Sequence, residues 1–148
     1  MRLVDSSLGC RLVTIHDDKK TGDLYLWGIR WRKEGLGATI TDTKAEAIAG
    51  PSIQILIDGA SIGTYQVGRR AEGAAGANVV ADLPPSDNAK LFSLMGKGGT
   101  MQFVTSASTY SATLDGAQRA LSDFRACTSE AGRLSANLTG PNVNPSKE

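Results

Sequence analysis

Apolar and polar positions alternate along much of the chain with a period of two, which is typical of half-buried strands. The first alternating run covers 10–16 and is rich in β-branched residues, and a polar segment at 17–23 separates it from a second run at 24–31. The two runs therefore predict a β-hairpin. One face of the second run is strongly aromatic and apolar, and it carries Tyr25, Trp27, Ile29 and Trp31.

A second hairpin is predicted further along the chain. Residues 52–57 alternate well, and 61–67 form the expected return strand. The Asp58-Gly59 pair between them suits the positive φ angles of a tight turn. Residues 68–77 are rich in Gly and Ala and have too little bulk to pack, so this segment is predicted to be a surface loop.

Helical spacing is found in two later segments. The first predicts a short helix near 86–96 with Ser86 as its cap, and the second predicts a helix near 115–127. Asp115 is placed to cap this second helix, with Gln118 three residues on as in a capping box. Its apolar stripe consists of Ala117, Ala120, Leu121, Phe124 and Cys127.

These elements predict an α+β fold with an antiparallel sheet or a small β-sandwich, because strands joined by short turns outnumber helices. Shorter strands are expected at 38–41, 78–83, 100–105 and 109–113. Residues 1–128 are assigned to a single β-rich domain. Residues 129–148 are polar and contain Gly and Pro, so they are expected to form a flexible C-terminal tail.

The two cysteines stand near the two ends of this predicted domain. Cys10 opens the first strand and Cys127 closes the last amphipathic segment, so a disulfide between them would join both ends. The chain-entropy model gives such a bond about 4–5 kcal/mol for a loop of roughly 100 residues. Disulfides persist in oxidising compartments, which favours a periplasmic or secreted protein whose signal peptide has been removed. The alternative is a pair of buried free thiols.

From residue 52 onward, the order of the parts is similar to that of a known family. A hairpin ends in Ile57-Asp58-Gly59, a mobile loop and a short helix running into Lys97-Gly98 follow, and a strand pair leads to the segment 114–121. This order resembles secreted proteobacterial proteins of the invasion-associated locus B type and related periplasmic families with a Leu-x-Gly-x-x-x-Ala-Leu signature. The resemblance covers 52–127 and implies a periplasmic or surface location and a non-catalytic role. Such families often carry further cysteines near an early tryptophan, and this chain departs from that pattern.

The charge balance narrows the range of partners. The chain has 16 Lys and Arg against 15 Asp and Glu, and a net charge of +1 provides no long-range field that would gather phosphates. Nucleic acid is therefore not expected as a partner. No apolar run approaches the roughly 20 residues of a membrane span, so no membrane span is expected either.

Catalytic chemistry has little support in the sequence. His16 is the only histidine, and no serine is marked as an activated nucleophile, so we expect no enzyme, no catalytic residue and no cofactor. His16 could hold a metal with Asp17 and Asp18, but a solvated turn is favoured. The glycine-rich segment 96–100 has the wrong order for a phosphate-binding loop, because it follows a helix instead of preceding one.

Binding has two candidate sites. Trp27 and Trp31 could stack on a ligand if they were exposed, although burial is favoured for so few aromatic residues. Arg69 and Arg70, at the root of the predicted loop, could pair with an acidic partner, with a plain surface turn as the alternative. We therefore expect a non-catalytic binding protein whose partner is another protein. The alternatives are an inhibitor or immunity-type protein that masks an enzyme or toxin, and a structural subunit of an extracellular assembly.

Overall fold

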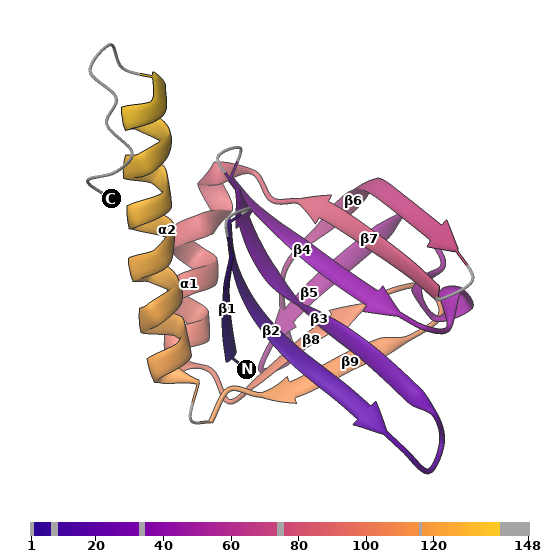
Figure 1. Ribbon diagram of the computed structural model, residues 1–148. Helices are drawn as coiled ribbons and strands as arrows, with labels where there is room; N and C mark the ends of the chain where they lie inside the picture. Colours follow the sequence, from indigo (N-terminus) through magenta and orange to yellow (C-terminus); the bar gives the residue numbers. More distant parts are fainter. Residues whose placement is uncertain (1, 7–8, 33–34, 74–75, 116, 140–148) are drawn as a thin grey trace.

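An antiparallel sheet that curls on itself, with two helices at one end, forms the described part of the chain (Figure 1). The computed structural model describes residues 2–6, 9–32, 35–73, 76–115 and 117–139. The nine strands follow the order β1-β2-β3-β4-β7-β6-β5-β8-β9 across the sheet. They are β1 (Arg2–Ser6), β2 (Gly9–Asp18), β3 (Asp23–Arg32), β4 (Gly35–Asp42), β5 (Ser52–Ile57), β6 (Ala60–Gly73), β7 (Gly76–Asp82), β8 (Thr100–Val104) and β9 (Thr109–Thr113). The predicted α+β class is confirmed.

Both predicted hairpins are present. β2 and β3 pair in antiparallel register, with Leu12 opposite Ile29 and His16 opposite Tyr25. The turn between β5 and β6 has positive φ angles at Asp58 (51°) and Gly59 (81°), as the Asp-Gly pair predicts. Local patterns of alternation and turn residues thus place these four strands correctly.

The prediction of a surface loop at 68–77 is wrong for its described residues. β6 continues to Gly73 and β7 begins at Gly76, with Arg70 opposite Val79 in their ladder. The side chains of β6 are exposed from Gly68 onward, so this half of the strand is formed by backbone pairing and not by side-chain burial. The pairing register shifts between Val67 and Arg69, and such a bulge bends a strand.

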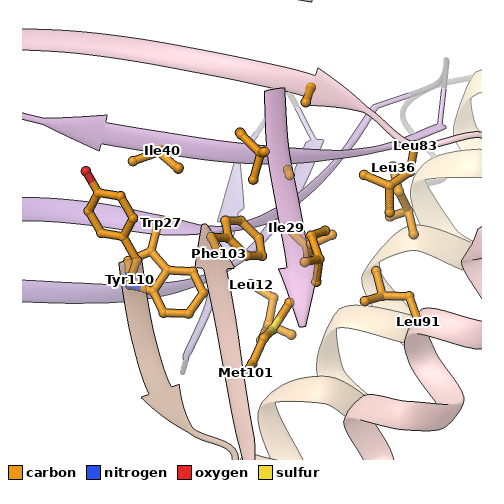
Figure 2. Packing of buried hydrophobic residues seen from close by; sticks show 14 of the residues in the cluster. Leu12, Trp27, Ile29, Leu36, Ile40, Leu83, Leu91, Met101, Phe103 and Tyr110 are labelled. Atoms are coloured by element: carbon orange, nitrogen blue, oxygen red, sulfur yellow. The ribbon is translucent and has the colours of Figure 1, made fainter. Parts of the chain in front are cut away.

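β6 is the strand on which the sheet turns. Its first half pairs with β5 and its second half pairs with β7, so one strand belongs to both halves of the sheet. The curl brings β3 against β8 and β9, which are not its neighbours in the ladder. The ring of Trp27 lies 4.7 Å from that of Phe103 and 6.5 Å from that of Tyr110, so these three rings fill the space between the two halves (Figure 2).

The two helices cover one end of the curled sheet (Figure 1). Leu91 and Met95 of α1 (Asn88–Lys97) and Leu121 and Phe124 of α2 (Gln118–Thr139) are buried in the same core as the strands. Each fully buried side chain of this size contributes roughly 1.5–3 kcal/mol relative to exposure. The apolar stripe predicted for the second helix is therefore confirmed.

The predicted disulfide is also present. Cys10 of β2 and Cys127 of α2 are bonded across a sequence separation of 117 residues, with their Cα atoms 6.1 Å apart. Cys10 is buried, and it lies directly opposite Trp31 in the β2–β3 ladder. The bond therefore fixes α2 to the strand pair at the helix-covered end of the sheet.

The helix boundaries differ from the sequence prediction. α2 begins at Gln118, whose side chain donates to the Gly96 carbonyl at 3.1 Å instead of completing a capping box. Ser86 lies in a short 3-10 turn, η2 (Pro85–Asp87), and no side chain caps α1. A second 3-10 turn, η1 (Ala45–Ile48), follows β4.

α2 extends well beyond the predicted end of the helix. It continues to Thr139, so 129–139, which the sequence assigned to the flexible tail, is helical. This stretch contains Ala, Glu, Arg and Leu, which favour helix, and a single Gly132 costs only about 1 kcal/mol. Residues 140–148 of the predicted tail lie outside the described part, and the domain boundary near 128 stays a prediction.

Candidate functional site: a polar pocket at the mouth of the curled sheet

A small cavity opens at the end of the curled sheet that the helices leave uncovered. Its volume is about 180 Å³. The walls come from β3, from the turn after β4, from η1, and from β9 with the turn before it. We call this cavity the mouth pocket, and its lining residues are Asp23, Tyr25, Asp42, Lys44, Ala47, Ser108, Thr109 and Tyr110.

The deepest charged group of the mouth pocket is Asp42. This residue is only 5% exposed, and its Oδ2 accepts a hydrogen bond of 2.7 Å from the Tyr110 hydroxyl. Its Oδ1 accepts the backbone N–H of Lys44 at 2.9 Å. Burial and, after it, the hydrogen bond to the Asp42 carboxylate raise the pKa of Tyr110 far above its ordinary value. Tyr110 therefore stays neutral and donates to Asp42.

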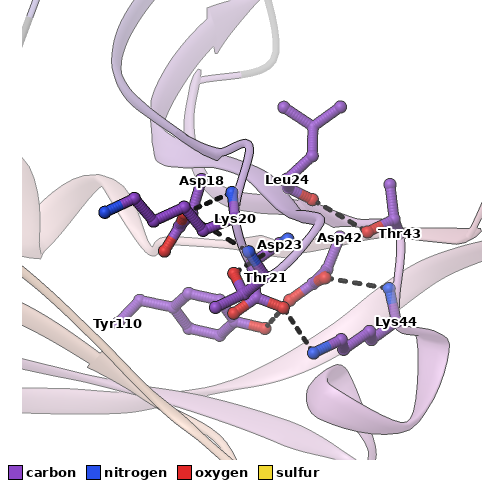
Figure 3. A network of polar contacts seen from close by, with 9 residues as sticks. All are labelled: Asp18, Lys20, Thr21, Asp23, Leu24, Asp42, Thr43, Lys44 and Tyr110. Atoms are coloured by element: carbon purple, nitrogen blue, oxygen red, sulfur yellow. Dashed lines mark hydrogen bonds and ion pairs between the residues drawn. The ribbon is translucent and has the colours of Figure 1, made fainter.

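An ion pair stands at the rim of the mouth pocket. The Lys44 ammonium contacts Asp23 Oδ1, and both side chains are partly exposed (Figure 3). The hydrogen bond from Lys44 lowers the pKa of Asp23, and the same bond raises the pKa of Lys44. The positive charge of Lys44 is thus already directed at Asp23.

Aromatic rings form the wall between these groups. The imidazole of His16 stacks on Tyr25 with centroids 4.5 Å apart, and Tyr25 meets Tyr110 edge-on at 5.0 Å. Burial, followed by the nearby carboxylates of Asp42 and Asp23, raises the pKa of Tyr25. The Tyr25 hydroxyl forms no hydrogen bond with any residue that the structure describes. It is therefore available to a ligand.

Two buried polar atoms without hydrogen-bond partners lie deeper in the curled sheet, on the face of β2 and β3 that carries His16 and Tyr25. Thr14 and Trp27 are directly opposite in the β2–β3 ladder, two positions along each strand from the His16–Tyr25 pair and therefore on the same face. Thr14 Oγ1 and Trp27 Nε1 are both buried, and neither has a hydrogen-bond partner among the described residues. Buried polar atoms without partners are rare, so this region is suited to a polar guest.

The structure does not bring together the four binding residues expected from the sequence. Trp27 is fully buried, which is the arrangement that the sequence favoured, so its ring offers no exposed contact surface. Trp31 packs against the core near the disulfide, at the opposite end of β3 from Tyr25. Arg69 is exposed on β6, while the Arg70 guanidinium donates to the carbonyls of Ile48 at 2.6 Å and Ala45 at 3.3 Å. Arg70 thus anchors η1.

The other sequence motifs have structural roles. His16 is half-buried against Tyr25, and no group of three or more His, Cys, Asp or Glu side chains in the described ranges is arranged to hold a metal. In the glycine-rich segment, the N–H groups of Gly99 and Thr100 both donate to the Asp58 carboxylate at 2.9 Å. These amides are therefore already bonded and are not directed at an anion.

Sequence reasoning missed the main residues of the mouth pocket. Asp42 and Tyr110 are 68 positions apart, and no spacing rule predicts their contact. One signal was present: Asp42 is a carboxylate that directly follows the strand predicted at 38–41, at a position where the strand pattern continues. A charged residue at an inward position is a candidate for function.

No helix among the residues described here is both long and apolar enough to cross a membrane.

Comparison with known proteins shows a shared fold and no shared sequence family. No protein-family model matches the chain, and no curated protein matches it either. Among solved structures, invasion associated protein B from Bartonella henselae is similar, with a TM-score of 0.53 and 11% sequence identity. The likeness covers 84% of this chain and 90% of that one, so it extends beyond the segment 52–127 in which the sequence pattern resembles that family. At this identity, the comparison establishes that the two chains share a fold.

Proposed function

We propose that this protein is a secreted or periplasmic, non-catalytic binding protein that engages its partner through the mouth pocket. The observation that carries this proposal is the combination of the Cys10–Cys127 disulfide at the helix-covered end with an open cavity at the other end. One end of the curled sheet is covalently closed, and the other presents polar and aromatic groups to the solvent. Barrel mouths are frequent sites of ligand binding.

The location is supported by the disulfide and by the fold. Disulfides are stable in the periplasm and outside the cell, and they are rare in reducing compartments. The similar Bartonella protein is described as invasion associated, and the sequence pattern at 52–127 resembles secreted proteins of that type. Both observations favour an extracytoplasmic protein.

The non-catalytic role is supported by the composition of the mouth pocket. A nucleophilic mechanism needs a base within hydrogen-bond reach of a serine, threonine or cysteine. The imidazole of His16 stacks on Tyr25 and is not among the lining residues, and both carboxylates are held by Tyr110 and Lys44. The groups of the mouth pocket are arranged to bind and orient a ligand.

The location can be tested by quenching intact cells of the source with acid and alkylating the denatured protein, because Cys10 is buried and would resist alkylation in the folded state even as a free thiol. We expect Cys10 and Cys127 to resist alkylation until a reductant is added, because the disulfide forms in the native compartment. Two freely alkylated thiols would overturn the extracytoplasmic location.

The binding surface can be tested by in vivo photo-crosslinking. A photo-reactive residue at Thr109, which lines the mouth pocket, is expected to give a discrete protein adduct. The matched control is Ser122, which is exposed on α2 at the helix-covered end and should give none. Adducts at Ser122 alone, or at neither position, would refute binding through the mouth pocket.

A further inference from the structure

We propose that the mouth pocket recognises a protonated amine, with the buried carboxylate of Asp42 as its counter-ion and the rings of Tyr25 and Tyr110 as its walls. This inference rests on the proposed function and names the chemistry of its ligand.

The Asp42 carboxylate has no cation in direct contact among the described residues. The residue is 5% exposed, and its two oxygens accept hydrogen bonds from neutral groups, the Tyr110 hydroxyl and the Lys44 backbone N–H. The ammonium of Lys44 contacts Asp23 instead. A buried carboxylate costs several kcal/mol unless a cation balances it. A cationic ligand in the adjoining cavity would supply that balance.

The charged groups that line the mouth pocket are negative on balance. The lining contains two carboxylates, Asp23 and Asp42, and one ammonium, Lys44. The same two carboxylates contribute to the raised pKa of Tyr25, which shows that their field reaches its hydroxyl. A cation would be attracted to this field, and an anion would be repelled.

The aromatic walls and the size of the mouth pocket also suit an organic cation. The rings of Tyr25 and Tyr110 meet edge-on with centroids 5.0 Å apart, and aromatic faces attract organic cations. A volume of about 180 Å³ corresponds to roughly six water molecules at about 30 Å³ each. An aminoalkyl group of the length of a lysine side chain is small enough for this space.

Two buried polar atoms lie close behind the mouth pocket, apart from its carboxylates. The Trp27 side chain is fully buried, yet its indole N–H has no acceptor among the described residues, and Thr14 Oγ1 opposite it is also without a partner. Trp27 lies 6.5 Å from the ring of Tyr110, which lines the mouth pocket. The two atoms form a polar layer behind Tyr110, although neither Trp27 nor Thr14 lines the mouth pocket itself.

A protonated amine could come from a lysine side chain of a partner protein or from a free amine. Nα-acetyl-lysine amide represents the first source, and cadaverine represents the second. Nα,Nε-diacetyl-lysine amide has nearly the same shape as Nα-acetyl-lysine amide without the charge, and glutarate is an anion of similar length. Titration of the full, oxidised protein with each probe, followed by NMR, distinguishes them.

We expect both cationic probes to shift the Trp27 indole N–H signal and the ring signals of Tyr25 and Tyr110. Binding should weaken at least tenfold for Nα,Nε-diacetyl-lysine amide, and glutarate should not bind. Tighter binding of Nα-acetyl-lysine amide would indicate a partner protein, and tighter binding of cadaverine would indicate a free amine. Equal binding of the charged and diacetylated lysine probes, or preferential binding of glutarate, would overturn the proposal.

Substitutions test the roles of individual residues. Asp42→Asn keeps an acceptor for Tyr110 but removes the charge, and we expect it to weaken cadaverine binding at least tenfold. The matched control is Asp82→Asn, which makes the same change at an exposed residue of β7 and should leave binding unchanged. Lys44→Met should strengthen binding severalfold, because it releases Asp23 from its ion pair; this variant also tests the proposal if Asp42→Asn fails to fold. The proposal would be contradicted if Lys44→Met left cadaverine binding unchanged, or if Asp82→Asn weakened it.

Failure of amine binding can be distinguished from failure of the proposed binding role. A Thr109 crosslink to a partner, together with no binding of either amine, would refute the amine and leave the binding role in place. Absence of the Thr109 crosslink, together with no binding of either amine, would refute the binding role itself.

Discussion

The hydroxyl of Tyr110 donates a hydrogen bond of 2.7 Å to Asp42 Oδ2, and the two residues lie 68 positions apart in the chain. Tyr110 belongs to β9 and Asp42 to β4, and these strands are not neighbours in the sheet. The bond therefore crosses the inside of the curl and connects its two halves at the mouth. The same two residues therefore join the two halves of the sheet and form the floor of the mouth pocket.

Replacing Tyr110 with Phe should destabilise the protein by about 2 kcal/mol, because the change leaves a buried carboxylate short of one donor. The matched control is Tyr25→Phe, which removes a hydroxyl that has no hydrogen-bond partner in the described part of the chain and should cost less than about 0.5 kcal/mol. Urea unfolding of both variants measures the difference. Equal losses would show that the Tyr110–Asp42 bond adds nothing to closure.

The sequence alone predicted the features that depend on local pattern. The turn at Asp58-Gly59 follows from the backbone freedom of two adjacent residues, and the placement of Cys127 follows from the 3.6-residue period of its helix. The disulfide partner could be deduced because Cys10 is the only other cysteine. These inferences need no knowledge of which strands are neighbours.

The features that sequence reasoning missed depend on contacts between distant segments. The second half of β6 has exposed side chains from Gly68 to Gly73, and it is a strand because β7 lies beside it to accept its backbone hydrogen bonds. The mouth pocket likewise exists because the curl brings Asp42 next to Tyr110. Propensity and period carry no information on such pairings, so tertiary context decides them.

Tyr65 provides a test of stability against pH. Its hydroxyl donates to Asp87 Oδ2 at 2.8 Å, and burial, followed by this bond, raises the pKa of Tyr65 from 10 to about 12. Because the folded state holds the proton more tightly than the unfolded state, the contribution is fully present below pH 10 and is lost as the pH rises toward 12. We expect a loss on the order of 2 kcal/mol over this window.

Urea unfolding at pH 8, 10 and 11 would measure this loss in the wild type and in Tyr65→Phe. The variant should be less stable at pH 8, and its stability should fall less steeply above pH 10. The pKa values of Tyr110 and Lys44 are also raised in the folded protein, but they are raised in both proteins, so the difference between the two curves isolates Tyr65. Parallel curves would contradict the raised pKa.

The two adjacent arginines of β6 should behave differently. Arg70 donates to the carbonyls of Ile48 and Ala45 and pairs with Glu72, so Arg70→Met removes the attachment of η1 to β6. We expect a loss of about 2 kcal/mol, since hydrogen bonds from a charged group to carbonyls are the stronger kind. Arg69→Met changes an exposed side chain and should stay within about 0.5 kcal/mol. Thermal unfolding compares the two, and similar losses would show that Arg70 has no special structural role.

Reduction of the Cys10–Cys127 bond should destabilise the protein by about 5 kcal/mol, because it releases a closed loop of 117 residues in the unfolded chain. The effect should begin at α2, whose Cys127 is held to β2 by this bond, while the hairpin of β5 and β6 keeps its own ladder. Hydrogen exchange with and without reductant would follow both regions. We expect the amides of 118–129 to lose protection first and those of 53–57 last. Uniform loss of protection, or an unchanged melting temperature in reductant, would show that the disulfide does not restrain the helix separately from the sheet.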